Sequence, residues 1–223
     1  MSVTPLIPQA FWFRLAIPCP RLESLPKPGD KGRLLDLPDS CRVVPTVEFE
    51  GREPWSEARV AWNSSGLALQ FEVRGKLSKV HHDPYMADAS DGVQLWIDTR
   101  DTRDVHRATR FCHRFSASLV PDQAKKTVDV KFEQKPIHRA LADSPLAKPD
   151  AIRARAEVIP KGWRLELFLG AEALHGFDPE TNRRLGLAYQ VSDPDRGDEF
   201  LTVGRDFPIG EDPSLWATLE LRD

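Results

Sequence analysis

The sequence predicts an all-β fold, an antiparallel two-sheet β-sandwich of the jelly-roll type with at most short helical turns. Three observations lead to this class. Many short segments alternate apolar and other residues with a period of two, which is typical of strands with one buried face. No segment keeps a helical period for more than about two turns. Finally, 19 prolines and 13 glycines divide the chain with turn signals.

The clearest pair of strands lies in residues 90–119, which read SDGVQLWIDTRDTRDVHRATRFCHRFSASL. In the first half Val93, Leu95 and Ile97 occupy alternate positions, and in the second half the alternation runs from residue 111 to residue 119. Trp96 lies on the opposite face from Val93, and we expect it to be a packing residue. The link over residues 99–108 interleaves aspartates with arginines, which favours surface salt bridges.

The remaining strands are predicted from the same alternation. Two of the connections are short hairpin turns, Asn63-Ser64-Ser65-Gly66 and Pro160-Lys161-Gly162. One helical turn is expected over residues 171–175, before Gly176. The predicted strands cover residues 11–17, 43–50, 58–62, 67–74, 126–133, 152–159, 163–169, 185–191, 200–203 and 215–221.

The length and the proline distribution predict one sandwich domain with an N-terminal extension. A chain of 223 residues fits a single large β-sandwich. Residues 1–42 are rich in proline, which prevents a long helix or a central strand, so we expect them to pack on the domain as a meandering segment. The domain itself would occupy residues 43–223.

The charge balance excludes several classes of partner. The 31 basic and 34 acidic residues give a net charge of −3, which provides no electrostatic footprint for nucleic acid or anionic lipid. No apolar run approaches the ~18 residues of a transmembrane helix, and no signal peptide is recognised, so we expect a cytoplasmic protein without membrane contact.

Cys19, Cys41 and Cys112 suit buried thiols in a reducing compartment. The oligomeric state is not indicated.

Five motifs in order resemble the family 9 carbohydrate-binding modules and their DOMON-like relatives, from about residue 43 to residue 221. They are PWSEARVAWNSSGLALQFEVRG, DGVQLWIDTRD, GWRLELFLGAEALHGFDPE, RLGLAYQVSDPD and DPSLWATLEL. The resemblance implies a β-sandwich that holds sugar rings between two aromatic side chains near its rim, with charged groups bonding the hydroxyls. One fold hosts unrelated functions, so the motifs are more specific for the fold than for the activity.

The resemblance also implies where a sugar would bind. Gln94 stands where the family strand usually has glutamate, Tyr85 stands where the preceding loop usually has tryptophan, and Phe200 would be the second aromatic. Sugar rings stack on aromatic faces and their hydroxyls need amide, carboxylate or guanidinium partners, so Arg110 and Arg114 complete a suitable set. The alternative is that Phe200 belongs to the core and Tyr85 merely covers a loop.

Two groups of residues are candidates for metal binding. His81, His82, His106 and His113, with Cys112, include good ligands for zinc, but their spacing matches no strong metal motif. Cys112 and His113 are neighbours on one strand and point to opposite faces, and the apolar residues on either side of His113 favour a core histidine.

Calcium is the other candidate metal, because the resemblance implies structural calcium. Asp98, Asp101 and Asp104 would supply carboxylate ligands, although their spacing is not that of an EF-hand loop and the interleaved arginines favour salt bridges. The acidic run over residues 193–199 is a second possible calcium site.

The leading interpretation is therefore non-catalytic binding of a saccharide or similar small polar ligand at the rim of a β-sandwich. No nucleophile elbow, phosphate-binding glycine loop or paired-histidine metalloprotease motif is present, which argues against an enzyme. Two alternatives stay open. One is a protein-interaction or structural module without sugar affinity, and the other is a metal-dependent enzyme that uses His81, His82, His106 and His113.

Overall fold

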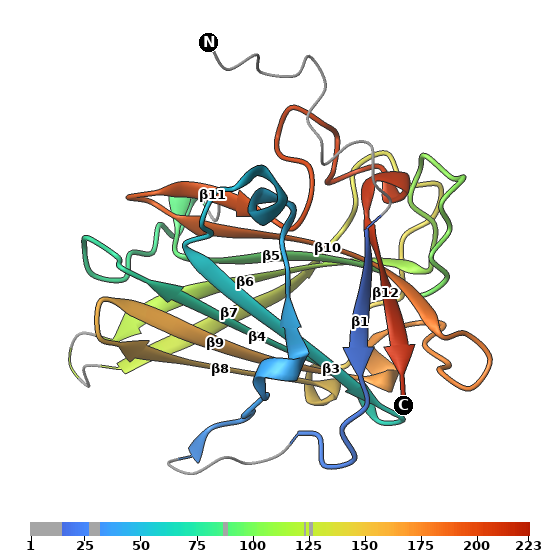
Figure 1. Ribbon diagram of the computed structural model, residues 1–223, viewed down its shortest axis with the longest axis horizontal. Coiled ribbons are helices and arrows are strands. Elements are labelled where there is room, and N and C mark those ends of the chain that lie inside the picture. Colours follow the sequence, from blue (N-terminus) through green and yellow to red (C-terminus); the bar gives the residue numbers. More distant parts are fainter. Residues whose placement is uncertain (1–14, 27–31, 87–88, 123, 125–126) are drawn as a thin grey trace.

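The computed structural model describes residues 15–26, 32–86, 89–122, 124 and 127–223, and it shows two β-sheets packed face to face (Figure 1). This confirms the predicted fold class, an all-β sandwich. The helical elements are short 3₁₀ turns, which include η3 (Asp39–Cys41), η4 (Thr46–Glu50), η6 (Pro149–Ala151), η7 (Ala171–Ala173) and η8 (Pro213–Leu215). No helix in the described part of the chain is long and apolar enough to cross a membrane.

The larger sheet, sheet A, carries the strands on which the candidate site lies. It has seven strands, six of them in the order β1-β12-β10-β5-β6-β7, while β11 pairs with β10 alone. The neighbours are antiparallel except for β1, which runs parallel to β12. Their bounds are β1 Ala16–Pro20, β5 Gly92–Asp98, β6 Cys112–Asp122, β7 Thr127–Lys135, β10 Arg184–Asp193, β11 Gly197–Phe200 and β12 Ala217–Arg222.

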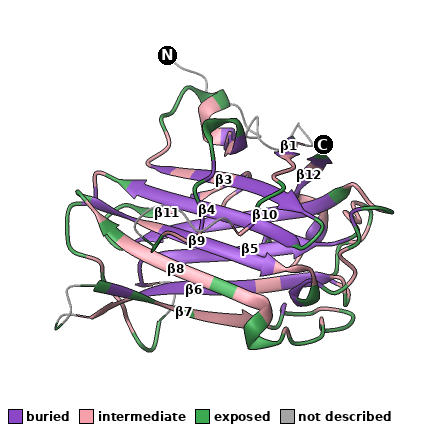
Figure 2. Ribbon diagram, turned by 90° about the horizontal axis from the view of Figure 1, so that it is seen from below, coloured by how far each residue is buried: buried purple, intermediate pink, exposed green. Residues whose placement is uncertain are grey.

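The smaller sheet, sheet B, closes the other side of the core. Its five strands follow the order β2-β3-β4-β9-β8, and every pair is antiparallel. The strands are β2 Arg42–Val43, β3 Ser56–Asn63, β4 Gly66–Arg74, β8 Ile152–Ile159 and β9 Gly162–Gly170. In Figure 2 the central strands are buried, whereas β7 and β8 at the sheet edges are largely of intermediate burial.

Several predicted strand bounds are wrong, each for a local reason. Of the strand predicted over residues 43–50, only Val43 lies in a strand, β2. Pro45 is followed by the 3₁₀ turn η4, and Gly51, with a φ of 73°, caps the end of that turn. Residue 200, where a strand was predicted to begin, is instead the last residue of β11. The strand predicted from residue 215 begins later, as β12, after the 3₁₀ turn η8. Residues 11–14 and residue 126, which were predicted as strand, lie outside the described residues.

The core lies between the two sheets and is built from the predicted alternation. Leu67, Leu69, Phe71 and Val73 of β4 face it, as predicted, and are fully buried. The ring of Phe71 meets the Tyr189 ring of the opposite sheet edge to face, with centroids 5.3 Å apart. Burying one such side chain is worth about 1.5–3 kcal/mol, so this interface supplies most of the apolar stabilisation.

Apolar residues also pack on the outer faces of both sheets. Residues of the proline-rich segment, among them Leu35 and Leu37, cover Ala68 and Phe168 on sheet B. On sheet A, Trp96 is 3% exposed, which confirms the expected packing role. It belongs to an apolar strip that also contains Ala108, Cys112, Ile137, Ala188, Val203, Ile209 and Trp216.

A buried ion network joins the ends of four strands. The Lys76 ammonium lies 3.0 Å from Asp91 and 3.1 Å from Asp193, and the three side chains are at most 1% exposed. The Trp163 indole donates to the same Asp91 oxygen over 3.1 Å. Burial alone would lower the pKa of Lys76, but its bonds to the two carboxylates outweigh that effect and raise it.

We predict that Lys76→Met lowers the free energy of unfolding by about 3–5 kcal/mol, because it leaves two buried carboxylates without their cation. Guanidinium denaturation measures this change. Lys79→Met is the matched control, since Lys79 is exposed in the same loop, and it should change stability by no more than about 0.5 kcal/mol. A loss below about 1 kcal/mol for Lys76→Met would contradict the structural importance of the network.

Candidate functional site

A group of polar side chains lies on the outer face of sheet A, where four neighbouring strands meet. Gln94 of β5 pairs with Ser116 of β6 and with Gln190 of β10, and Gln190 pairs with Phe200 of β11. Side chains of paired residues point to the same face of a sheet. We call this surface the amide face, and it consists of Gln94, Arg114, Ser116, Gln190, Ser192, Asp198 and Phe200.

The orientation of the Gln94 amide is set by its neighbours on β6. Its nitrogen donates to the Ser116 hydroxyl over 3.0 Å, and the Arg114 guanidinium donates to its oxygen over 3.4 Å. Arg114 also lies over the Trp96 ring, 5.7 Å from the centroid. A primary amide has two N–H groups and two lone pairs, so Gln94 retains one donor and one acceptor position.

Gln190 is oriented by the other edge of the amide face. Its nitrogen donates to the Ser192 hydroxyl and to the Asp198 carboxylate, each over 3.0 Å. Ser192 donates to the same carboxylate oxygen over 2.8 Å, and Arg205 neutralises the other oxygen at 2.6 Å. Since both N–H groups of Gln190 are used, its carbonyl oxygen is the group that it can offer to a ligand.

The structure brings three of the five predicted ligand residues together: Gln94, Arg114 and Phe200. Phe200 is half-buried against the apolar strip. Arg110 lies elsewhere, in the turn before β6, with its guanidinium 5.1 Å from the Phe111 centroid. Arg110 is not part of the amide face, and its assignment to the sugar site stays a prediction.

Tyr85 lies in the loop before β5 and is 94% exposed. Its backbone N–H donates to Asp83, while no ring contact to Phe200 is found in the described part of the chain. Its assignment as the second stacking residue stays a prediction. Sequence reasoning missed Gln190 and Ser192, although the alternation in β10 placed both on the face opposite the apolar residues, and it assigned Asp198 only to the possible calcium site over residues 193–199.

The three predicted calcium ligands have other partners. The Asp98 carboxylate accepts the backbone N–H groups of Arg100 and Thr102, over 2.9 and 2.7 Å. Asp101 pairs with Arg103 at 3.4 Å and with Arg184 at 3.2 Å. Within the described ranges, which include all three aspartates, no group of three or more His, Cys, Asp or Glu is placed to hold a metal. Calcium binding stays a prediction.

The four predicted histidine ligands lie in three separate places, because only His81 and His82 are neighbours. His82 contacts Ser90 in the loop before β5, and His106 pairs with Asp212 at 3.0 Å. His113 is fully buried on the inner face, where its Nε2–H donates to the His175 carbonyl oxygen over 3.3 Å. The adjacent Cys112 is no activated nucleophile, because burial raises the pKa of its thiol to about 12. The metal-dependent enzyme therefore lacks a converging ligand set among the residues that the structure describes.

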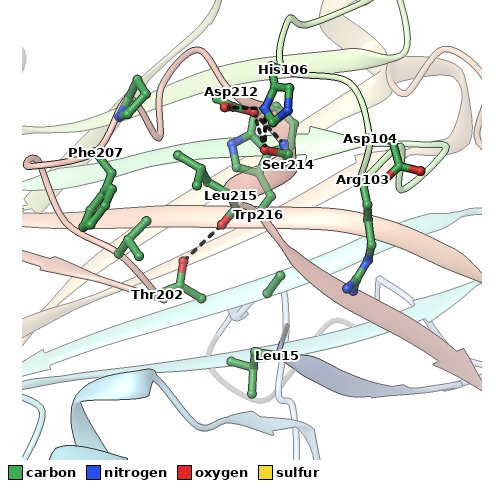
Figure 3. Close-up of a pocket in the computed structure, with 13 residues that line it drawn as sticks. Leu15, Arg103, Asp104, His106, Thr202, Phe207, Asp212, Ser214, Leu215 and Trp216 are labelled. Atoms are coloured by element: carbon green, nitrogen blue, oxygen red, sulfur yellow. Dashed lines mark hydrogen bonds and ion pairs between the residues drawn. The ribbon is translucent and has the colours of Figure 1, made fainter. Parts of the chain in front are cut away.

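A pocket of about 640 Å³ lies between the residues that precede β12 and the link that joins β5 to β6 (Figure 3). His106, Asp212 and Ser214 lie at one end of it and have the composition of a catalytic triad. The geometry is different, because Asp212 and Ser214 both contact the same ring nitrogen, Nδ1 of His106, at 3.0 and 3.1 Å. A serine nucleophile needs the nitrogen opposite the carboxylate, so these three residues do not form a triad.

Comparison with known proteins identifies similar folds. No protein-family model and no curated protein matches the sequence. A family 9 carbohydrate-binding module from Caldicellulosiruptor kristjanssonii in complex with cellotriose is 13% identical with a TM-score of 0.59, over 93% of each chain. The same kind of module in complex with glucose is 12% identical with a TM-score of 0.58, over 93% of this chain and 95% of that one. The chain has the fold of these modules.

A third similar structure is a putative carbohydrate-binding protein from Bacteroides uniformis. It is 9% identical with a TM-score of 0.53, over 93% of this chain and 99% of that one. These neighbours agree with the predicted resemblance to family 9 modules, whereas the DOMON-like part of that resemblance stays a prediction. At such low identities the comparison establishes the fold and not the site.

We predict that protonation of His113 destabilises the protein. Burial lowers its pKa to about 4, below the value of about 6.5 expected in the unfolded chain. The neutral His113 ring therefore makes its full contribution to the free energy of unfolding above pH 6.5. This contribution, on the order of 3 kcal/mol, is lost as the pH falls toward 4. Urea denaturation between pH 7 and pH 4 should show a smaller loss for His113→Gln than for the wild type. The exposed His81→Gln control should follow the wild type.

Proposed function

We propose that the protein binds a saccharide without transforming it and that the amide face bonds the sugar hydroxyls. The observation that carries this proposal is the pairing of Gln94 and Gln190 on adjacent strands, with each amide oriented by a second polar side chain. Two planar amides side by side offer donors and acceptors at the spacing of neighbouring strands. Neutral hydroxyl groups suit such partners, because each hydroxyl can both donate and accept.

The bonding within the amide face favours binding of a neutral ligand. Ser116 and Ser192 hold the two amides in place before a ligand arrives, so less side-chain freedom is lost on binding. Asp198 is neutralised by Arg205, and Phe200 adds a half-buried aromatic surface beside Gln190. An aromatic surface next to hydroxyl-bonding groups is the combination that a sugar ring requires.

The positions of two carboxylates on this side of sheet A favour binding rather than hydrolysis. Asp198 of the amide face lies on β11, and Glu133, which pairs with Ser116 but is not part of the amide face, lies on β7. Four strand spacings separate them, about 19 Å, whereas glycosidases use carboxyl groups about 5–9.5 Å apart. These two groups therefore cannot act together on one glycosidic bond.

The similar structures suggest the first ligands to test. Two of them were solved with cellotriose and with glucose. These ligands belong to those proteins, and they support neutral glucose-based sugars as probes for this one. We therefore propose a glucose-based sugar as the ligand of this protein.

A protein-interaction function is the second candidate, and one observation favours it. Leu77, Tyr85 and Met86 are 83%, 94% and 59% exposed, all in the connection between β4 and β5. Tyr85 and Met86 are neighbours in sequence, and adjacent exposed apolar groups favour contact with other molecules. Titration of the Tyr85→Ala variant separates the two roles. If the variant binds sugar more weakly, Tyr85 belongs to the sugar site. If its sugar affinity is unchanged, Tyr85 is free to serve the protein-interaction function.

We predict that glucose or cellotriose binds with a dissociation constant in the millimolar range or tighter, about 4 kcal/mol or more, measured by isothermal titration calorimetry. Gln94→Ala and Gln190→Ala should each weaken binding about 2- to 10-fold, the effect of one hydrogen bond. Gln70→Ala is the matched control. Gln70 is 5% exposed, compared with 6% for Gln94, but it lies on sheet B and should leave the affinity unchanged.

Two results would contradict the saccharide proposal. One is the absence of heat for every neutral sugar of the panel at millimolar concentration. The other is an equal loss of affinity in Gln70→Ala and Gln94→Ala, because that would trace the effect to general stability. Thermal unfolding of each variant checks that the folded protein was titrated.

A further inference from the structure

The pocket of Figure 3 differs from the amide face in position and in composition. One wall comes from the covering segment, which we define as residues 202–216, and the other from the link before β6. It shares no residue with the amide face. The apolar strip separates the two, because Trp96 lies two residues from Gln94 on the same face of β5 and packs with Trp216 in that strip. The two sites therefore consist of different residues.

The size and lining of the pocket suit a small organic ring. Its volume of about 640 Å³ falls within the range of small-molecule sites, about 300–1,000 Å³. About half of the lining side chains are apolar, with polar groups at the two ends. The apolar members are Leu15, Val203, Phe207, Pro208, Leu215, Trp216 and Ala217.

The hydrogen bonds at one end of the pocket fix the proton positions on His106. The Ser214 hydroxyl donates to Asp212 Oδ1 over 2.7 Å, so its oxygen can only accept from His106 Nδ1 at 3.1 Å. Asp212 Oδ2, at 3.0 Å, is also an acceptor. Nδ1 therefore carries the proton, and in the neutral ring Nε2 is left as an acceptor without a partner among the described residues. This nitrogen suits a ligand hydroxyl.

The charged side chains around the pocket are paired within the protein, which favours a neutral ligand. Arg103 at the far end is paired with Asp101 at 3.4 Å, and Asp212 is bonded by His106 and Ser214. Asp104 adds a further carboxylate to the lining. The lining thus holds one cation, Arg103, and two carboxylates, Asp104 and Asp212, and each of them has a partner within the protein. A neutral molecule with several hydroxyl groups can bond to such donors and acceptors without bringing a further charge into the pocket.

We infer that this pocket is a second ligand site, which takes a neutral polyhydroxylated ring such as a single pyranose or a cyclitol. The ring packs against Phe207 and Leu215, and one of its hydroxyls donates to His106 Nε2. The inference does not depend on the proposed role of the amide face, because the residues and the contacts are different.

Two-dimensional NMR of the labelled full chain, titrated with glucose and with myo-inositol, tests the inference. The Trp216 indole N–H, which donates to the Ile209 carbonyl over 2.7 Å, and the methyl groups of Leu15, Val203 and Leu215 report on the pocket. The side-chain amides of Gln94 and Gln190 report on the amide face. We expect the pocket signals to shift and to saturate in the millimolar range.

His106→Ala and His138→Ala form a matched pair. Both histidines contact an acidic residue through Nδ1, His138 with Glu211 at 2.8 Å, and their side chains are 76% and 75% exposed. Only His106 lines the pocket. His106→Ala should weaken the pocket titration about 2- to 10-fold, and His138→Ala should leave it unchanged. Phe207→Ala should also weaken it.

The outcomes separate the two sites. Pocket signals that do not move with either probe overturn the second site, even where the Gln94 and Gln190 amides respond. Equal weakening by His106→Ala and His138→Ala overturns it as well, because the effect would then come from the covering segment. Pocket signals that shift while the amide signals stay fixed support the second site and count against the amide face.

Discussion

The buried contact of Lys76 with Asp91 and Asp193 is the constraint on which the arrangement of the site depends. Lys76 follows β4 and Trp163 lies at the start of β9, both in sheet B, while Asp91 precedes β5 and Asp193 ends β10, both in sheet A. The network therefore fixes two adjacent strands of sheet A relative to sheet B. Those two strands carry Gln94 and Gln190, whose separation and direction decide what the amide face can bind. A buried ion pair adds little net stability over an apolar replacement, so its value here lies in geometry.

A second contact between the sheets positions the aromatic side of the amide face. The Glu199 carboxylate accepts the backbone N–H groups of Trp55 and Ser56, over 2.9 and 3.2 Å. Glu199 and Phe200 are neighbours on β11, so they point to opposite faces. The same short strand is thus attached to sheet B through one residue and presents an aromatic ring outward through the next. Because β11 pairs only with β10, this attachment compensates for its missing second neighbour.

The sequence predicts strands best where one face of the strand lies on the core. The alternation in residues 67–74, 152–159 and 163–169 matches β4, β8 and β9 almost residue for residue. It fails between Pro45 and Gly51, where a 3₁₀ turn uses the same apolar residues. Gln94 was predicted from the resemblance to the family strand, and Arg114 because a guanidinium group suits sugar hydroxyls. The sequence could not predict that Gln190 lies beside Gln94, since alternation shows which face of a strand a residue occupies and not which distant strand is its neighbour.

The covering segment links the pocket to the apolar strip. Glu211 and Asp212 are consecutive residues, and each binds a histidine from a different loop, His138 and His106. The two loops are joined to each other, because Arg107 donates to the Arg139 carbonyl oxygen over 2.9 Å. The segment is therefore held from both sides at a single turn, and the Trp216 indole bonds back to Ile209 within it. Because Ile209 packs in the strip with Trp96, a change at that turn alters the pocket wall and the cover over Trp96 together.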